Sequence, residues 1–98
     1  MVMPGLTLLS TPGHTPGHQS VLVELPESGP ILLCGDAGFL QENFEKEIIP
    51  VFFGDPDQAL LSIKKLKKCS CDRNAQLFPT HDTDYWRQHM KKSPEAYT

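Results

Sequence analysis

The doubled tetrapeptide Thr-Pro-Gly-His at residues 11–18 constrains the fold of this chain more than any other feature. Proline fixes the backbone angle φ and glycine permits positive φ, so this segment must be a shaped loop rather than a helix or a strand. The loop carries two imidazoles, those of His14 and His18. A loop with so little conformational freedom is well suited to direct an imidazole at a metal ion.

The segments on either side of this loop predict short strands. Residues 6–10 form a β-like run, and residues 19–25 partly alternate between apolar and polar side chains. A turn at residues 26–30 leads to the continuous apolar run 31–34, which we expect to be a strand covered on both faces. The two runs on either side of this turn should pair as a hairpin.

Helical patterns follow in the second half of the chain. The acidic stretch 42–47 could form a short helical turn, and Asp55 followed by Pro56 is typical of a helix start. An apolar stripe with helical spacing comes next: Ala59, Leu60, Ile63 and Leu66. Residues 75–78 predict a last strand, and residues 85–92 predict a terminal helix. We therefore expect one domain of class α/β (α+β), with a mixed sheet covered by helices on one face.

The composition argues against several classes of protein. The 98 residues suffice for one small domain, and the formal net charge of −3 does not indicate a nucleic-acid partner. No apolar run is long enough to span a membrane, and residues 1–5 do not resemble a signal peptide, so we expect a cytoplasmic protein without a membrane partner. The odd number of cysteines argues against a disulfide framework, and Cys34 is predicted to be a buried, small apolar residue.

Three side chains that can ligate a metal stand near predicted strand ends or in the constrained loop. They are His14, Asp36 and His81, and they lie too far apart in the sequence to come from one helix or finger. Nitrogen and oxygen donors together suit Zn²⁺, and also Fe, Mn or Co. Because a carboxylate has two oxygens, Asp36 could bridge two ions about 3.5–4 Å apart, an arrangement typical of metal-dependent hydrolases.

Each of these residues also has a purely structural interpretation. A single loop histidine more often stabilises a fold than binds a metal, and Asp36 could be no more than a turn residue. We favour the ligand roles because the doubled motif around His14 is rare by chance and because Asp36 follows a buried apolar run. Asp82, next to His81, could orient a ligand histidine or cap a helix.

The order of these motifs resembles the C-terminal half of a metallo-β-lactamase-fold hydrolase. The resemblance is carried by residues 11–18, the strand pair, Leu-Cys-Gly-Asp-Ala at 33–37 and Pro-Thr-His-Asp at 79–82. Within that superfamily the chain is most similar to the N-acyl homoserine lactonases, at residues 17–20, 42–45 and 55–64. The resemblance implies half of an αββα sandwich, with residues 1–98 as a single partial domain.

The resemblance also implies roles for individual side chains. His14 matches the histidine that ligates the first metal, and Asp36 matches the aspartate that bridges both metals. His81 matches the histidine that ligates the second metal. His18 matches a position that is not a ligand and that hydrogen-bonds to brace the loop. Phe39 takes the place of a substrate-binding tyrosine, whose hydroxyl contacts the substrate carbonyl.

The activity that the resemblance implies is hydrolysis at a centre of two zinc ions. Such an enzyme opens the ester of a small-molecule lactone by attack of metal-bound hydroxide, the reaction of quorum quenching. Asp36 could then relay a proton to the leaving alkoxide. A thioester hydrolase of the glyoxalase II type and a non-catalytic remnant are the alternatives.

One ligand motif of the superfamily, His-x-His-x-Asp-His, does not occur in these 98 residues. The other histidines, His18 and His89, do not have its spacing. We therefore expect a fragment that is inactive by itself, because three ligands are too few for a two-metal centre. We also expect an uncovered apolar sheet face, through which the chain would associate with a missing N-terminal half or with itself.

Overall fold

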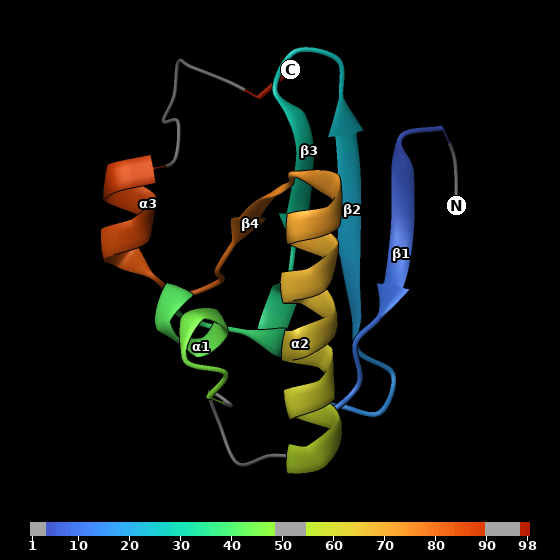
Figure 1. The fold of residues 1–98 in the computed structure, drawn as a ribbon, viewed down its shortest axis with the longest axis vertical. Coiled ribbons are helices and arrows are strands. Elements are labelled where there is room, and N and C mark those ends of the chain that lie inside the picture. Colours follow the sequence, from blue (N-terminus) through green and yellow to red (C-terminus); the bar gives the residue numbers. More distant parts are fainter. Residues whose placement is uncertain (1–3, 49–54, 90–96) are drawn as a thin grey trace.

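A four-stranded mixed sheet forms the centre of the computed structural model, which describes residues 4–48, 55–89 and 97–98 (Figure 1). The strand order is β1-β2-β3-β4; the first three strands are antiparallel neighbours, and β4 runs parallel to β3. The predicted hairpin is therefore confirmed as the pair β2 and β3. The bounds are Leu6–Ser10 for β1, Gln19–Leu25 for β2, Gly29–Leu33 for β3 and Gln76–Phe78 for β4.

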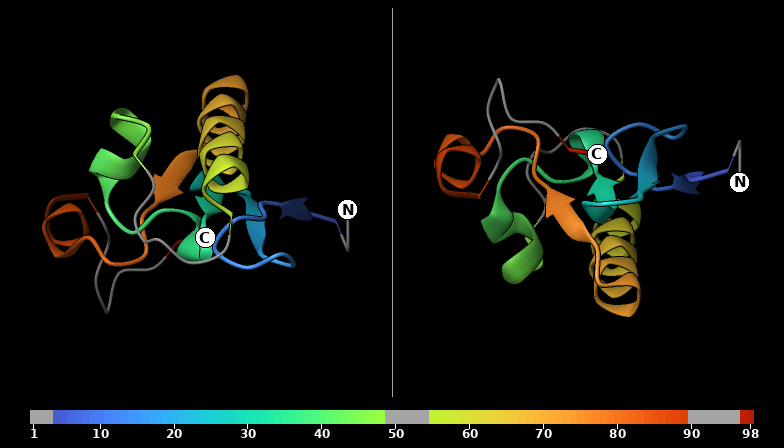
Figure 2. Two further views of the ribbon diagram at one scale, coloured as in Figure 1. Left: turned by 90° about the horizontal axis from the view of Figure 1, so that it is seen from below. Right: turned by 90° about the horizontal axis from the view of Figure 1, so that it is seen from above.

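Two helices cover one face of this sheet. The two views in Figure 2 agree that α1 and α2 lie on the same side of the sheet, whereas α3 lies beside the edge strand β4. A short 3₁₀ helix, η1, directly follows β3 and was not predicted. The bounds are Gly35–Ala37 for η1, Gln41–Glu45 for α1, Pro56–Arg73 for α2 and Thr83–His89 for α3.

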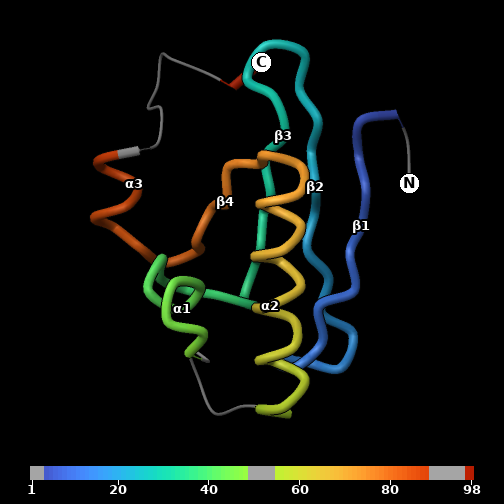
Figure 3. Tube along the Cα trace, in the orientation of Figure 1, coloured from blue at the N-terminus to red at the C-terminus, as the bar shows by residue number. Residues whose placement is uncertain are grey.

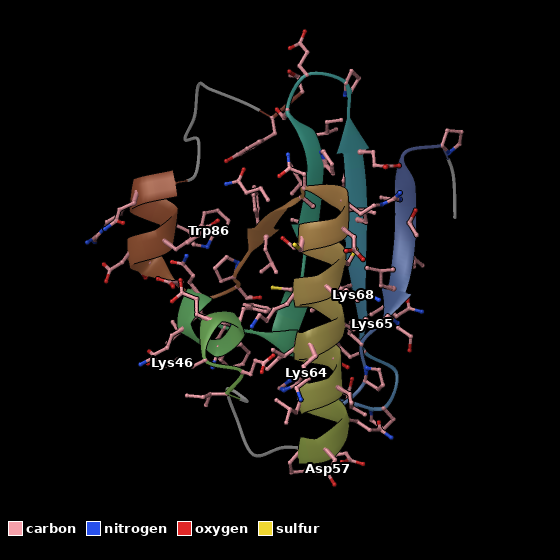
Figure 4. The ribbon with its side chains drawn as sticks, in the orientation of Figure 1. Lys46, Asp57, Lys64, Lys65, Lys68 and Trp86 are labelled. Carbon is pink, nitrogen blue, oxygen red and sulfur yellow. The ribbon has the colours of Figure 1, made fainter. Side chains whose placement is uncertain are left out.

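The predicted terminal helix differs from α3 in its bounds. It was expected at residues 85–92, but α3 begins at Thr83, and residues 90–92 lie outside the described part of the chain. The indole N–H of Trp86 donates to the carbonyl of Pro79 at 2.9 Å, which ties α3 to the segment after β4 (Figure 4). None of the helices among the described residues is long and apolar enough to cross a membrane.

The long helix α2 begins where the sequence predicts. The carboxylate of Asp55 accepts hydrogen bonds from the backbone N–H groups of Asp57 and Gln58, at 3.0 and 3.2 Å, and Pro56 is the first helical residue. The helix ends at Arg73 and is capped by Asn74, whose backbone is left-handed with a φ of 52°. Lys64, Lys65 and Lys68 are exposed along α2, consistent with a solvated helix surface (Figure 4).

The hydrophobic core lies between α2 and the sheet. Leu22 of β2 is paired with Leu32 of β3, and these two side chains form one cluster with Ile63 and Leu66 of α2. Leu32, Ile63 and Leu66 are completely buried, at 0% exposure. Leu77 of β4 lies next to Leu32 in the register and packs against the same cluster. This cluster therefore fixes α2 across the strands whose ends carry the candidate ligands.

The opposite face of the sheet carries an exposed apolar row. Leu8, Val21 and Leu33 are directly paired across β1, β2 and β3, and successive side chains of a strand point to opposite faces. Leu8 is 42% exposed and Leu33 is 41% exposed. The expectation that the run 31–34 is covered on both faces is therefore wrong at Leu33, whose side chain stays partly exposed. We call Leu8, Val21 and Leu33 the open row.

We predict that Asp55→Ala lowers the free energy of unfolding by about 1 kcal/mol, because two helical N–H groups lose their acceptor. Asp55→Asn keeps an acceptor oxygen, so it should lower the free energy of unfolding markedly less than Asp55→Ala. Urea denaturation followed by circular dichroism measures both variants. Equal losses for the two substitutions would contradict the capping role.

Candidate metal centre

The fold brings the three candidate ligands together at one end of the sheet. Figure 3 shows that the β1–β2 loop, η1 and the segment after β4 all lie at this end. The Nε2 atom of His14 is 3.6 Å from Oδ2 of Asp36, and the Nε2 atom of His81 is 3.9 Å from Oδ1 of the same carboxylate. The two carboxylate oxygens thus face different imidazoles. The side chains are partly open to solvent, at 24% for His14, 46% for Asp36 and 59% for His81.

These distances suit metal donors that share ions through one carboxylate. Two donors bound to a tetrahedral zinc ion at usual bond lengths lie roughly 3.3–3.6 Å apart. The His14–Asp36 pair matches this separation, and the His81–Asp36 pair is slightly wider. Among the described residues, however, no three His, Cys, Asp or Glu side chains are close enough to hold an ion. The described residues therefore bring these donors together in pairs.

The position of His14 depends on docking of its loop against α2. The Asp55 N–H donates to the carbonyl of Gly13 at 2.9 Å, and the Ser62 hydroxyl donates to the carbonyl of Pro12 at 2.6 Å. Gly13 has a φ of 141°, and a Cβ built on it would lie 2.4 Å from the Cα of Ala59. Only glycine allows the loop to approach the helix backbone this closely.

Asp36 lies on the short helix η1, and its backbone is held by the imidazole of His18. The Nε2 atom of His18 accepts a hydrogen bond from the Asp36 N–H at 2.9 Å. The Nδ1 atom of His18 contacts both the hydroxyl and the carbonyl oxygen of Thr11, at 2.9 and 3.1 Å. The hydrogen bonding expected for His18 within the loop is present, and the bond to Asp36 was not anticipated.

His81 is positioned through backbone bonds to the segment that follows η1. Its N–H donates to the carbonyl of Phe39 at 2.8 Å, and the N–H of Thr80 donates to the carbonyl of Gly38 at 3.3 Å. The Thr80 hydroxyl also donates to the carbonyl of Gly35. Three hydrogen bonds therefore join the segment carrying His81 to the segment carrying Asp36.

Asp82 acts as a helix cap in this structure. Its carboxylate accepts from the N–H of Tyr85 in the first turn of α3 at 3.0 Å, and from the N–H of Gln41 at the start of α1 at 2.9 Å. These backbone hydrogen bonds hold the pKa of Asp82 below its usual value. Of the two interpretations that the sequence left open for Asp82, the structure supports the cap.

Phe39 lies between the two candidate histidine ligands. Its ring centroid is 4.6 Å from that of His81 and 6.1 Å from that of His14, with edge-to-face inclinations of 79° and 66°. Phe39 therefore places an apolar ring next to both imidazoles and offers no hydroxyl there.

Several buried polar groups that support the site were not identified from the sequence. Thr11 and Ser20 are 1% and 0% exposed, and their hydroxyls are 2.8 Å apart. Cys34 is buried as predicted, and its thiol donates to the carbonyl of Phe78 in β4 at 2.8 Å. Burial raises the pKa of the Cys34 thiol to about 11, so it remains protonated at neutral pH.

The chain belongs to the metallo-beta-lactamase superfamily, whose sequence pattern matches residues 1–81. Among its curated relatives, an N-acyl homoserine lactonase of Bacillus sp is 49% identical over 86 residues, which are 88% of this chain and 34% of the relative. The N-acyl homoserine lactonase AttM of Rhizobium radiobacter is 40% identical over 92 residues, which are 94% of this chain and 35% of the relative.

Solved structures support the same assignment. An N-acyl homoserine lactone hydrolase with the product N-hexanoyl-L-homoserine bound at its catalytic metal centre has a TM-score of 0.85 and 45% sequence identity, over 97% of this chain and 37% of that one. The expected fold class, a mixed sheet with helices as in metallo-β-lactamase-fold hydrolases, is confirmed. The chain spans about a third of the length of the curated relatives it matches.

We predict that Gly13→Ala destabilises the protein by about 1–3 kcal/mol and displaces His14, because the new methyl group would overlap the α2 backbone. Gly17→Ala in the same loop is the matched control, since an added Cβ there meets nothing within 4 Å. Urea midpoints and the NMR shifts of the His14 ring measure both effects. A Gly13→Ala protein that behaves like Gly17→Ala would show that loop docking does not position His14.

Proposed function

We propose that these residues are part of a single metal-dependent hydrolase domain and supply three ligands of its two-metal centre. In this proposal, His14 binds one ion, His81 binds the other, and Asp36 bridges them. The observation that supports it best is that the two oxygens of Asp36 face different imidazoles, at 3.6 and 3.9 Å. Zinc is the expected metal, and Fe, Mn or Co are compatible with the same donors.

The reaction that we propose is the opening of a lactone, as in the lactonases to which the chain is similar. When bound, the two ions would activate a water molecule and polarise the substrate carbonyl. Addition of the water oxygen to the carbonyl carbon would give a tetrahedral intermediate, and its collapse would re-form the carbonyl, break the ring C–O bond and release the alkoxide. Asp36 would pass the proton of that water to the departing alkoxide.

Phe39 would contact the substrate through its ring alone. Its position between His14 and His81 places an apolar surface next to the carbonyl that reacts. Because phenylalanine has no donor, charge that develops on the carbonyl oxygen would be stabilised by groups other than Phe39.

We further propose that the 98 residues are inactive alone and act together with a segment that completes the metal shells. No three donor side chains among the described residues are close enough to hold an ion. The open row is where such a segment would pack, because Leu8 and Leu33 are exposed on the sheet face opposite α2. Burying this row removes apolar surface from water, which favours association. The segment can belong to the same polypeptide or to another chain.

The activity test combines the purified 98-residue chain with the segment of the Bacillus lactonase that this chain does not match. We expect no hydrolysis of N-hexanoyl homoserine lactone by either part alone, and hydrolysis by the mixture that a chelator abolishes. Asp36→Asn should remove the activity of the mixture while both parts still associate. A thioester substrate, assayed in parallel, tests the glyoxalase II alternative. Turnover by the 98-residue chain alone would contradict the proposal.

Association through the open row has its own test. We predict that Leu8→Lys or Leu33→Lys weakens binding of the complementary segment at least about tenfold, because an unpaired charge would be buried. Leu61→Lys is the matched control, since Leu61 is 66% exposed on α2, the helix that covers the other face. Analytical ultracentrifugation measures binding. Equal binding by all three variants, or self-association of the unmodified chain in place of binding, would exclude this docking surface for the segment.

A further inference from the structure

The imidazole of His18 joins the two segments that carry His14 and Asp36. It belongs to the same loop as His14, and through Nε2 it accepts the Asp36 N–H at 2.9 Å. Through Nδ1 it contacts the hydroxyl of Thr11 at 2.9 Å and the Thr11 carbonyl at 3.1 Å. Both ring nitrogens therefore have partners, and the partners lie on different segments of the chain.

These contacts determine which nitrogen of His18 carries the proton. A backbone N–H can only donate, so the Nε2 atom that faces the Asp36 N–H must be unprotonated. The ring is then neutral with its proton on Nδ1, where two oxygens of Thr11 lie within hydrogen-bonding distance. The geometry alone assigns this tautomer of His18. With the proton on Nε2 instead, the hydrogens of Nε2 and of the Asp36 N–H would point at each other.

The same direction of donation continues through two buried hydroxyls. If Nδ1–H of His18 donates to the Thr11 hydroxyl, that hydroxyl donates to Ser20 at 2.8 Å, and Ser20 donates to the carbonyl of Cys34 at 3.2 Å. Cys34 is separated from Asp36 only by Gly35. The hydrogen bonds therefore form a closed circuit around Gly35, which holds the carbonyl of Cys34 on one side and the N–H of Asp36 on the other.

Gly35 allows this turn to fit around the His18 ring. Its φ is 56°, and a Cβ built on it would lie 2.9 Å from Nε2 and 3.2 Å from Cε1 of His18. A side chain at this position would occupy the space of the imidazole. The absence of a side chain at Gly35 therefore leaves the space that the imidazole of His18 occupies.

We propose that His18 is a positioning residue, which holds the backbone of Asp36 so that its two carboxylate oxygens face different histidines. Bracing the loop would require only the contacts of Nδ1 with Thr11. The additional hydrogen bond of Nε2 joins His18 to the backbone of Asp36, which lies outside the loop. The effect on metal binding rests on the function proposed above. The hydrogen bond between the Asp36 N–H and His18, and the tautomer of the His18 ring, do not depend on that function.

The first experiment measures the hydrogen bond directly. In uniformly ¹⁵N-labelled protein without metal, we expect a scalar coupling between the Asp36 amide nitrogen and Nε2 of His18, and a proton on Nδ1. Absence of the coupling, or a proton on Nε2, would overturn the proposal. Because neither metal nor substrate is present, this result does not depend on the hydrolase function.

The second experiment separates the two nitrogens with a pair of variants. His18→Gln places an acceptor near the position of Nε2, and His18→Asn places a polar atom near that of Nδ1. We expect His18→Gln to keep slow hydrogen exchange at the Asp36 amide and His18→Asn to accelerate it at least about tenfold, because only His18→Asn removes the acceptor of that amide. The Thr11 amide, which donates to the His18 carbonyl, is the internal control and should exchange alike in both variants.

Metal affinity provides a further readout of the same pair. Titration with Co²⁺, followed by paramagnetic broadening of the His14 and His81 ring signals, should show about tenfold weaker binding for His18→Asn than for His18→Gln at similar melting temperatures. Equal affinity and equal Asp36 exchange in the two variants would reduce His18 to a loop brace. If the unmodified chain binds no Co²⁺ alone, the titration is repeated with the complementary lactonase segment present, and absence of binding there would count against the proposed metal ligands. The Asp36 exchange rates decide the role of His18 in either case.

Discussion

The arrangement of this site depends on the close contact between Gly13 and the backbone of α2. The carbonyl of Gly13 accepts the N–H of Asp55, and a single added carbon would overlap Ala59. Because α2 is itself fixed to the sheet by Ile63 and Leu66, the loop takes its position from the hydrophobic core. This docking fixes where the proline- and glycine-rich loop places His14 relative to the core.

The parallel pairing of β3 with β4 positions the other two candidate ligands, Asp36 and His81. Parallel neighbours end at the same edge of a sheet, so Asp36 after β3 and His81 after β4 emerge close together. The thiol of Cys34 strengthens this edge by donating to Phe78. Three segments distant in the sequence therefore present two imidazoles to one carboxylate, and η1 sets that carboxylate between them.

Local features of the chain were predictable, whereas contacts that depend on packing were not. The strands at residues 6–10 and 19–25 and the helix start at Asp55 follow from breakers, alternation and capping, which act over a few residues. His14 and Asp36 were proposed as ligands of one centre from their donor types and positions, and the family resemblance assigned each its role. The bond from Asp36 to His18 and the exposure of Leu33 depend on tertiary structure, and no short-range pattern indicates them.

The most direct measurement of the central claim is a crystal structure of the chain combined with the complementary lactonase segment, grown with zinc and recorded at the zinc absorption edge. The account predicts two anomalous peaks, one on each side of the Asp36 carboxylate, with His14 at one and His81 at the other. A single peak, or peaks that do not contact Asp36, would contradict the bridging role that the present geometry supports.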